Sequence, residues 1–142
     1  MTLRYLLDTS TVSLSEGRFP DAVVVSALRL MHDEAAIASV VWYELSYGME
    51  LLPPSRRKAE LREFLSEVVE ESYVILPYDA VAAEWNAREA ARLELLGLRR
   101  PFRDSQIASV AAVNGLILVT ANMRDFEHFR DLRVEDWSTP RR

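Results

Sequence analysis

The chain has 142 residues, of which 49% are hydrophobic and 27% are charged, and this is the size and balance of one domain with its own core. It contains no cysteine, so disulfides, thiolate nucleophiles and cysteine-ligated zinc sites are excluded. The formal net charge of −5 argues against a uniformly basic surface for nucleic acid but leaves room for a local basic site.

No segment has the character of a membrane anchor. The apolar stretch near Leu3 is too short and too early interrupted for a secretory signal, and no later run reaches the length of a membrane span. No internal repeat or low-complexity tract divides the sequence. We therefore expect residues 1–142 to form a single domain that is cytoplasmic and does not bind membranes.

The first elements are a strand, a helix and a second strand. Residues 3–7 form a short apolar run that predicts a buried strand, and the polar residues 8–11 after it are typical of a turn or a helix cap. A helix is expected at residues 22–31. A second strand is expected at residues 35–38, although its alanines have little β-propensity.

Two helices come next and are separated by a pair of prolines. Apolar positions at helical spacing predict helices at residues 39–52 and 55–71, and Pro53 ends the first of them. The two helices would pack as a hairpin. Apolar residues near Tyr47 on its first arm are compatible either with a groove for a partner or with ordinary packing inside the hairpin.

The second half of the chain continues the alternation of strands and helices. Apolar runs predict strands at residues 73–76, 116–119 and 132–134. Helical patterns are expected at residues 80–96 and 104–114, with a helical turn at 124–129. Short apolar strands that alternate with helices indicate an α/β fold, with a parallel sheet covered by helices on both faces.

Four carboxylates occupy positions where an acid needs a reason. Asp8 directly follows the first predicted strand, and Glu44 lies inside the apolar sequence 40–45, where an ionised carboxylate needs a partner or a cation. Asp104 and Asp125 flank the fourth predicted strand. Ligands of parallel sheets bind beyond the carboxyl ends of the strands, so all four acids could meet at that edge.

Three of these acids also have local explanations. Asp8 could cap a turn or helix, and Asp104 could be the N-cap of the helix predicted at 104–114. Asp125 could be the third residue of a turn capped by Asn122. Glu44 has no comparable local role. A shared site explains the convergence of all four better than four separate caps or surface positions.

A cluster of carboxylates predicts a cation. Carboxylates that lie close together repel, which raises their pKa values unless a cation neutralises them. Ligation by oxygen alone suits Mg²⁺ or Mn²⁺, and the matching chemistry is hydrolysis of a phosphodiester by a metal-activated water. His32 and His128 have polar neighbours, and we expect them to be surface residues without a catalytic role.

Several short segments carry a resemblance to a known family. They are residues 5–10 (YLLDTS), 44–48 (ELSYG), 104–108 (DSQIA), 118–126 (LVTANMRDF) and 132–137 (LRVEDW). In this order and spacing they resemble a PIN-domain ribonuclease, specifically the VapC-like toxins of bacterial type II toxin–antitoxin systems. The resemblance covers nearly the whole chain. It implies a single PIN-like domain, a three-layer sandwich with a central, mainly parallel sheet flanked by helices.

The resemblance assigns roles to individual residues. Asp8 and Asp104 would be direct metal ligands, while Glu44 and Asp125 would orient metal waters or hold a second ion transiently. Hydrogen bonds that support these ligands would come from Ser10, Thr120 and Asn122.

The resemblance also implies an activity and partners. The protein would be a Mg²⁺- or Mn²⁺-dependent endoribonuclease that cuts structured RNA, often tRNA or rRNA, at a single-stranded loop. Family members usually pair with a small VapB-like antitoxin that lies across the active site. They often dimerise, so a homodimer is implied, and operator DNA would be contacted only through the antitoxin.

A basic loop precedes Asp104. Its arginines are Arg99, Arg100 and Arg103. The planar fork of arginine matches phosphate oxygens, so these residues could hold RNA beside a negatively charged pocket. An exposed loop of solvated arginines explains them equally well.

Two other functions compete with RNA cleavage. A PIN-like binding module could keep the acids yet act with an antitoxin as a DNA-bound regulator, which the acidic net charge favours. A phosphatase or phospho-accepting receiver also places Asp at strand ends. A receiver, however, would need a lysine at a far strand end, and the only lysine here is Lys58, in the predicted hairpin.

Overall fold

Five strands form the centre of the fold in the computed structural model, which describes residues 2–140. The strands are β1 (Tyr5–Leu7), β2 (Ala35–Ala38), β3 (Val74–Leu76), β4 (Ile117–Val119) and β5 (Val134–Glu135). Their order across the sheet is β3-β2-β1-β4-β5, and every neighbouring pair is parallel. Parallel neighbours need crossover connections, which the helices supply.

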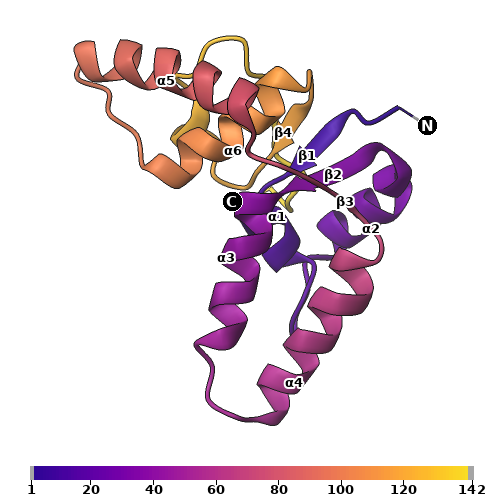
Figure 1. Cartoon of the computed structure of the whole chain (residues 1–142). Coiled ribbons are helices and arrows are strands. Elements are labelled where there is room, and N and C mark those ends of the chain that lie inside the picture. The colour runs from indigo at the N-terminus through magenta and orange to yellow at the C-terminus, as the bar shows by residue number, and fades with distance from the viewer. Residues whose placement is uncertain (1, 141–142) are drawn as a thin grey trace.

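Helices flank the sheet and form two groups (Figure 1). The helices are α1 (Thr9–Leu14), α2 (Ala22–Met31), α3 (Ser39–Glu50), α4 (Arg56–Glu63), α5 (Ala80–Leu95) and α6 (Phe102–Val113). The short turns are η1 (His32–Glu34), the π-helical η2 (Phe64–Glu70) and η3 (Met123–Phe126). Figure 1 shows α3 and α4 as a hairpin below the sheet and α5 and α6 as a pair above it. The expected α/β sandwich is confirmed, and no helix within residues 2–140 is long and apolar enough to cross a bilayer.

The core explains why the strands lack polar alternation. Leu6 of β1, Ile37 of β2 and Leu118 of β4 are completely buried, and Val41 of α3 and Val110 of α6 are buried with them. A strand covered by helices on both faces buries consecutive residues, so its sequence reads as a continuous apolar run. This burial is the main source of stability at the sheet.

The register of the sheet brings two distant polar residues together. Leu7, at the end of β1, is paired with Val119, at the end of β4. Asp8 and Thr120 therefore leave the sheet side by side, and the backbone N–H of Asp8 donates to the carbonyl of Val119 at 2.9 Å. The carboxyl edge of the two central strands is thus lined by polar side chains.

One helix was not predicted as such. Residues 8–11 were expected to form a turn or a cap, and Asp8 is indeed the cap of a complete short helix, α1. Its serine, threonine and valine residues have modest helix propensity. The helix forms because Thr11 and Val12 are buried against the core, so tertiary packing outweighs local preference.

Other boundaries differ in ways that have physical causes. The helix predicted at 104–114 begins at Phe102, because Pro101 supplies the fixed φ that suits a helix start. The segment predicted as one helix at 55–71 is helical without a break, but its geometry changes from α-helical in α4 to π-helical in η2 at Phe64. Four of the five strands are shorter than the apolar runs that predicted them; in β1, for example, pairing begins at Tyr5 and not at Leu3, whereas β2 has the predicted bounds.

Candidate active site

Asp8 is a buried acid held by hydrogen bonds from the start of α1 and from the residue that follows β4. Its Oδ1 accepts the backbone N–H of Thr9 at 2.8 Å, the bond expected of a helix cap. Its Oδ2 accepts the hydroxyls of Thr120 at 2.8 Å and Ser10 at 3.3 Å. Burial raises the pKa of Asp8, the hydrogen bonds oppose this, and the net pKa lies above the ordinary value. Capping of α1 uses only the Oδ1 atom of Asp8. The hydrogen bonds to Oδ2 therefore indicate that Asp8 has a further role.

Ser10 and Thr120 form a small network around that oxygen. Their hydroxyls lie 3.2 Å apart, and Ser10 Oγ also accepts the N–H of Ala121 at 3.1 Å. Thr120 Oγ1 accepts the backbone N–H of Asn122 at 3.0 Å. Of the three residues predicted to support the site, Ser10 and Thr120 contact Asp8 through side chains, whereas Asn122 takes part through its backbone.

Glu44 sits on the first helix of the hairpin and is only partly buried. Its Oε1 accepts the hydroxyl of Thr9 at 3.0 Å, and Nη1 of Arg103 lies 3.9 Å from its Oε2. The side chain is 23% exposed and its carboxylate has polar partners, which its place among apolar sequence neighbours was expected to require. Val40 and Val41, one helical turn earlier on α3, are buried, whereas the carboxylate of Glu44 contacts Thr9 and Arg103.

Asp104 and Asp125 complete the acidic group from the other half of the chain. Asp104 is half-buried in the first turn of α6, two residues inside the helix, so its predicted role as N-cap was wrong. Asp125 is exposed on η3. Asn122 is the N-cap residue of this turn and Asp125 its third residue, as the local explanation expected, although the side chain of Asn122 makes no capping hydrogen bond in the described structure.

The four acids share one electrostatic environment. The pKa of Asp104 is raised to about 6, first by burial and then by the charges of Asp125, Asp8 and Glu44, while Arg100 opposes the rise. Asp125 likewise raises the pKa of Asp8. The fold therefore gathers at one edge of the sheet four acids that the sequence separates widely.

The geometry limits how these acids could hold a metal. Within residues 2–140, no three acidic or histidine side chains converge closely enough to bind one ion together. Mg²⁺ and Mn²⁺ keep several waters and bind through one or two carboxylates plus substrate phosphates. Two closely interacting acids with raised pKa values, in the absence of cysteine, are a donor set that fits such a cation.

The predicted basic loop divides into two parts. Arg103 lies against Glu44, and Arg100 is close enough to lower the pKa of Asp104. Arg99 is exposed and lines, with Arg100 and Phe102, a hollow of about 530 Å³ between the ends of α5 and α6. Arg100 and Arg103 therefore flank the acids, while Arg99 faces the α5 side.

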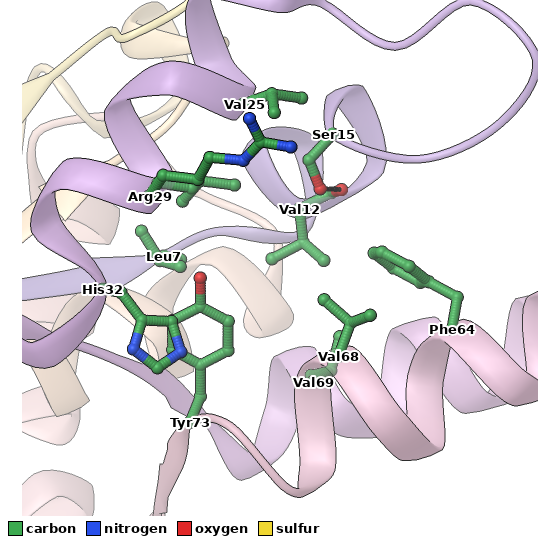
Figure 2. A pocket seen from close by; sticks show the side chains of 11 residues that line it. Leu7, Val12, Ser15, Val25, Arg29, His32, Phe64, Val68, Val69 and Tyr73 are labelled. Atoms are coloured by element: carbon green, nitrogen blue, oxygen red, sulfur yellow. Dashed lines mark hydrogen bonds between the residues drawn. The ribbon is translucent and has the colours of Figure 1, made fainter.

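Two further hollows lie beside the hairpin. One of about 310 Å³ is lined mostly by apolar residues of α1, α2 and η2, among them Val12, Leu28 and Phe64, with His32 and Tyr73 at one end (Figure 2). None of the four acids lines it. A second, of about 400 Å³, runs between α3 and α4 and reaches Thr9 and Glu44. The hairpin thus contains a groove that ends at the acidic group.

The two histidines lie in other surroundings. His32 is 3.2 Å from Asp33 and its ring packs near that of Tyr73, while His128 is 3.3 Å from Glu127. Both are partly exposed.

Thr9 is a residue of the site that the sequence did not single out. Its hydroxyl donates to Glu44, and the polar run after the first strand was the available signal.

The family of the chain follows from comparison with known proteins. Residues 5–132 match the model of the PIN domain, and the chain therefore belongs to the PIN-domain family. This membership sets aside the phosphatase and receiver alternatives.

Individual relatives show which members of the PIN-domain family this chain is similar to. A protein from Shigella flexneri named tRNA(fMet)-specific endonuclease VapC is 36% identical over 137 residues, which cover 96% of this chain and 99% of the relative. Ribonuclease VapC2 from Haemophilus influenzae is 33% identical over 136 residues, with 95% and 98% covered. The structure of VapBC2 from Rickettsia felis bound to a promoter DNA fragment aligns with a TM-score of 0.80 and 28% identity, covering 97% of this chain and 100% of that one.

Proposed function

We propose that this chain is an endoribonuclease toxin of a toxin–antitoxin pair, which hydrolyses RNA phosphodiesters at Asp8, Glu44, Asp104 and Asp125. The observation that carries the proposal is the gathering of these acids around Asp104, whose pKa is raised to about 6 by burial and by the charges of the other three. An acidic cluster at the carboxyl edge of a parallel sheet is expensive for stability and therefore indicates a function. The ribonuclease names of the relatives support the reaction class.

We infer that the site uses Mg²⁺ or Mn²⁺. Such an ion supplies a Lewis acid that offsets phosphate charge and activates water for attack. Asp8 and Asp104 are the residues that would hold it, because Asp8 is buried, Asp104 is half-buried and both have raised pKa values. Glu44 and Asp125 would orient waters.

The remaining residues of the site position these acids and the substrate. Thr120 and Ser10 fix the Oδ2 atom of Asp8, so this carboxylate is already oriented before a ligand arrives. Arg103 and Arg100 bring positive charge next to the acids, which offsets repulsion between the pocket and a phosphate backbone. The chain thus carries an acidic centre with a basic border.

The substrate and partners follow from the relatives. The name of the Shigella flexneri protein specifies tRNA(fMet), so tRNA is the first substrate class to test, with rRNA the second. Structural neighbours are VapBC complexes, and some contain DNA, which supports a VapB-like antitoxin that mediates contact with operator DNA. A segment of that partner lying in the groove between α3 and α4 would reach Glu44 and cover the acids. We also propose a homodimer.

A second candidate function is a regulator that binds DNA through its antitoxin without cutting RNA. The net charge of −5 and the DNA-bound complexes among the neighbours favour this role. One protein can have both roles. Study of the chain without its antitoxin distinguishes them, because only the endoribonuclease role then gives an activity.

Sequencing of RNA 5′ ends after expression in cells tests the proposal. The chain should generate new ends at one or a few positions in tRNA or rRNA, and Asp8→Asn should remove them while leaving the protein folded. Asp33→Asn, a change of an exposed acid, is the matched control and should cut as the parent does. Identical RNA ends in the parent and in Asp8→Asn would contradict the proposal, and the absence of new ends in all variants would favour the regulator.

A further inference from the structure

Two exposed tyrosines on α3 form a stacked pair. Tyr43 and Tyr47 are 50% and 47% exposed. Their ring centroids lie 5.7 Å apart, and the rings are nearly parallel, at 17°. They are one helical turn apart, so both project from the same side of the helix. About half of each ring surface is open to solvent, so packing within this chain does not account for both rings.

Arg103 extends this pair into a row of three flat groups. Its guanidinium carbon lies 5.0 Å above the centre of the Tyr43 ring, a cation–π arrangement. Arg103 comes from α6, on the other side of the site, and its side chain is 49% exposed. The row, Arg103, Tyr43 and Tyr47, therefore joins two elements that are distant in sequence.

The row begins at the acidic group. Nη1 of Arg103 lies 3.9 Å from Glu44, and Arg103 directly precedes Asp104 in the chain. Tyr43 directly precedes Glu44. If a phosphate of a nucleic-acid strand lies at the acids, the row is therefore within reach of the neighbouring nucleotides.

A shallow hollow adjoins the same end of the row. It measures about 310 Å³ and is lined by Ser39, Val40, Tyr43, Tyr78, Arg103 and Gln106. Two aromatic rings and a guanidinium offer flat surfaces, and the amide of Gln106 can donate and accept hydrogen bonds. This combination fits a flat heterocycle with polar edges.

We propose that Tyr43, Tyr47 and Arg103 hold the unpaired bases of single-stranded RNA beside the phosphate that is cut. This rests on the proposed function and adds to it the residues that select unpaired nucleotides. Proteins that bind single strands combine positive charge with exposed aromatic rings on which bases stack. Bases in a duplex already stack on one another and cannot use the row, so it favours loops over helices.

Arg103 has a defined part in this arrangement. In the free chain its charge is shared between Glu44 and the face of Tyr43. When RNA binds, the guanidinium can turn to a phosphate oxygen, and the face of Tyr43 that it covered becomes available to a base. The row is thus a positioning device for substrate, and the acids remain the reacting centre.

Binding to oligonucleotides that lack single bases tests this inference. The assay is fluorescence anisotropy of a labelled oligouridylate in Mg²⁺, with all proteins carrying Asp8→Asn so that cleavage does not interfere. The same oligomer with an abasic residue at each position in turn keeps the phosphates and removes one base. We expect one or two positions at which loss of the base weakens binding roughly five- to tenfold.

The variants assign that discrimination to the row. Tyr43→Leu combined with Tyr47→Leu should bind intact and abasic oligomers within about twofold of one another, because the stacking surface is gone. Tyr43→Phe combined with Tyr47→Phe keeps the rings and should retain the discrimination. The control is Phe19→Leu, which changes an exposed aromatic that also lies under an arginine, Arg18, on the loop before α2.

Several results would overturn the inference. These are equal binding of intact and abasic oligomers by the parent, no binding of either, or discrimination that survives in the leucine variant. A changed oligomeric state of the leucine variant with unchanged RNA binding would show that the row is a protein interface. If the chain with Asp8 restored cuts RNA in these cases, the proposed function stands and only the role of the row is wrong; absence of any cleavage by that chain would remove both.

Discussion

Two buried threonines at the same edge of the sheet serve different purposes. Thr11 is buried and donates its hydroxyl to the carbonyl of Val119 at 2.9 Å, a bond that fastens α1 to β4. Thr120 is equally buried but donates to Oδ2 of Asp8 at 2.8 Å. The first bond is structural, whereas the second orients a carboxylate. The pair therefore gives a matched test of what holds the site together.

Thr120→Val should weaken metal binding more than it weakens the fold. Loss of a hydrogen bond to a ligand carboxylate typically lowers metal affinity about 10- to 100-fold. Thr11→Val should cost about 0.5–1.5 kcal/mol of unfolding free energy, because it removes one of two hydrogen bonds to the carbonyl of Val119 while the N–H of Asp8 still donates to it, and should change metal affinity little. Calorimetric titration with Mn²⁺ and urea unfolding measure the two quantities. Equal loss of metal affinity in both variants would contradict a special role for Thr120.

The raised pKa of Asp104 predicts how the free energy of unfolding depends on pH. Its pKa is raised from 3.8 to about 6 in the folded chain, whereas the unfolded chain has the ordinary value. Between these values the folded state binds more protons, so this group makes the unfolding free energy fall as pH rises, and the penalty is complete above about pH 6. Asp104→Asn should therefore stabilise the metal-free chain at neutral pH and have little effect near pH 4.

Thermal unfolding in a chelator, with parent and Asp104→Asn compared across this pH range, measures the difference. Subtracting one Tm from the other removes the acid unfolding that other groups cause. Saturating Mg²⁺ should raise the Tm of the parent at neutral pH and raise that of Asp104→Asn less, because the cation relieves the same repulsion. A difference in Tm that grows towards low pH would show that the sign is wrong.

At the scale of elements, a buried acid on α5 fixes the turn that follows η3. Glu89 is 7% exposed and accepts the backbone N–H of Arg130 at 2.6 Å and Nε of Arg92 at 3.1 Å. Arg92 in turn donates to the carbonyl of His128 at 2.7 Å. Burial alone would raise the pKa of Glu89, but the bonds from Arg92 and Arg130 hold it below its usual value. This network secures the segment that follows Asp125.

Glu89→Gln should loosen that segment. Glutamine keeps one acceptor oxygen but leaves the charge of Arg92 without its partner, which costs about 1–3 kcal/mol. Because the pKa of Glu89 is lowered by folding, its contribution is present above the ordinary value near 4.5 and is lost as pH falls, so the difference between parent and variant should shrink in acid. Hydrogen exchange of residues 127–131 should quicken at neutral pH. Glu84→Gln, an exposed change on the same helix, is the control; equal exchange in both variants would contradict this role.

The sequence predicted the type of most elements and missed what depends on packing. Apolar runs located all five strands; β1, β2 and β4 are buried throughout, which requires consecutive apolar residues, whereas the outer strands β3 and β5 are only partly buried. Helix α1 escaped because its residues have weak helix propensity and only its burial against the core stabilises it. The change to π-helical geometry at Phe64 also leaves no local sequence signal. Local patterns report periodicity, whereas these features arise from contacts between elements.

At the scale of the whole molecule, parallel topology gathers the site. The order β3-β2-β1-β4-β5 puts the ends of β1 and β4 side by side at the centre of the sheet. Asp8 follows one of these strands, and the segment that carries Asp125 follows the other, while α6 leads Asp104 back to the same edge. This gathering could be predicted from strand order alone, since parallel strands share a carboxyl edge.

The electrostatic partners of the acids could not be predicted in the same way. The contacts of Glu44 with Thr9 and Arg103 depend on how the hairpin and α6 are placed on the sheet. The partial exposure of Glu44, beside the buried Val40 and Val41, also depends on this placement. The hydroxyls of Ser10 and Thr120 lie beside Asp8 because Ser10 is in the first turn of the helix after β1 and Thr120 directly follows β4.

The most direct test of the central claim is the rate at which the purified, antitoxin-free chain cuts cellular tRNA and rRNA as Mg²⁺ is titrated. The account predicts cleavage that saturates with Mg²⁺, disappears in chelator and returns with Mn²⁺. It also predicts a loss on the order of 10²-fold or more in Asp8→Asn and Asp104→Asn at every metal concentration. Cleavage that persists at the parental rate in chelator, or in both variants, would contradict the assignment of these acids as a metal site for RNA hydrolysis.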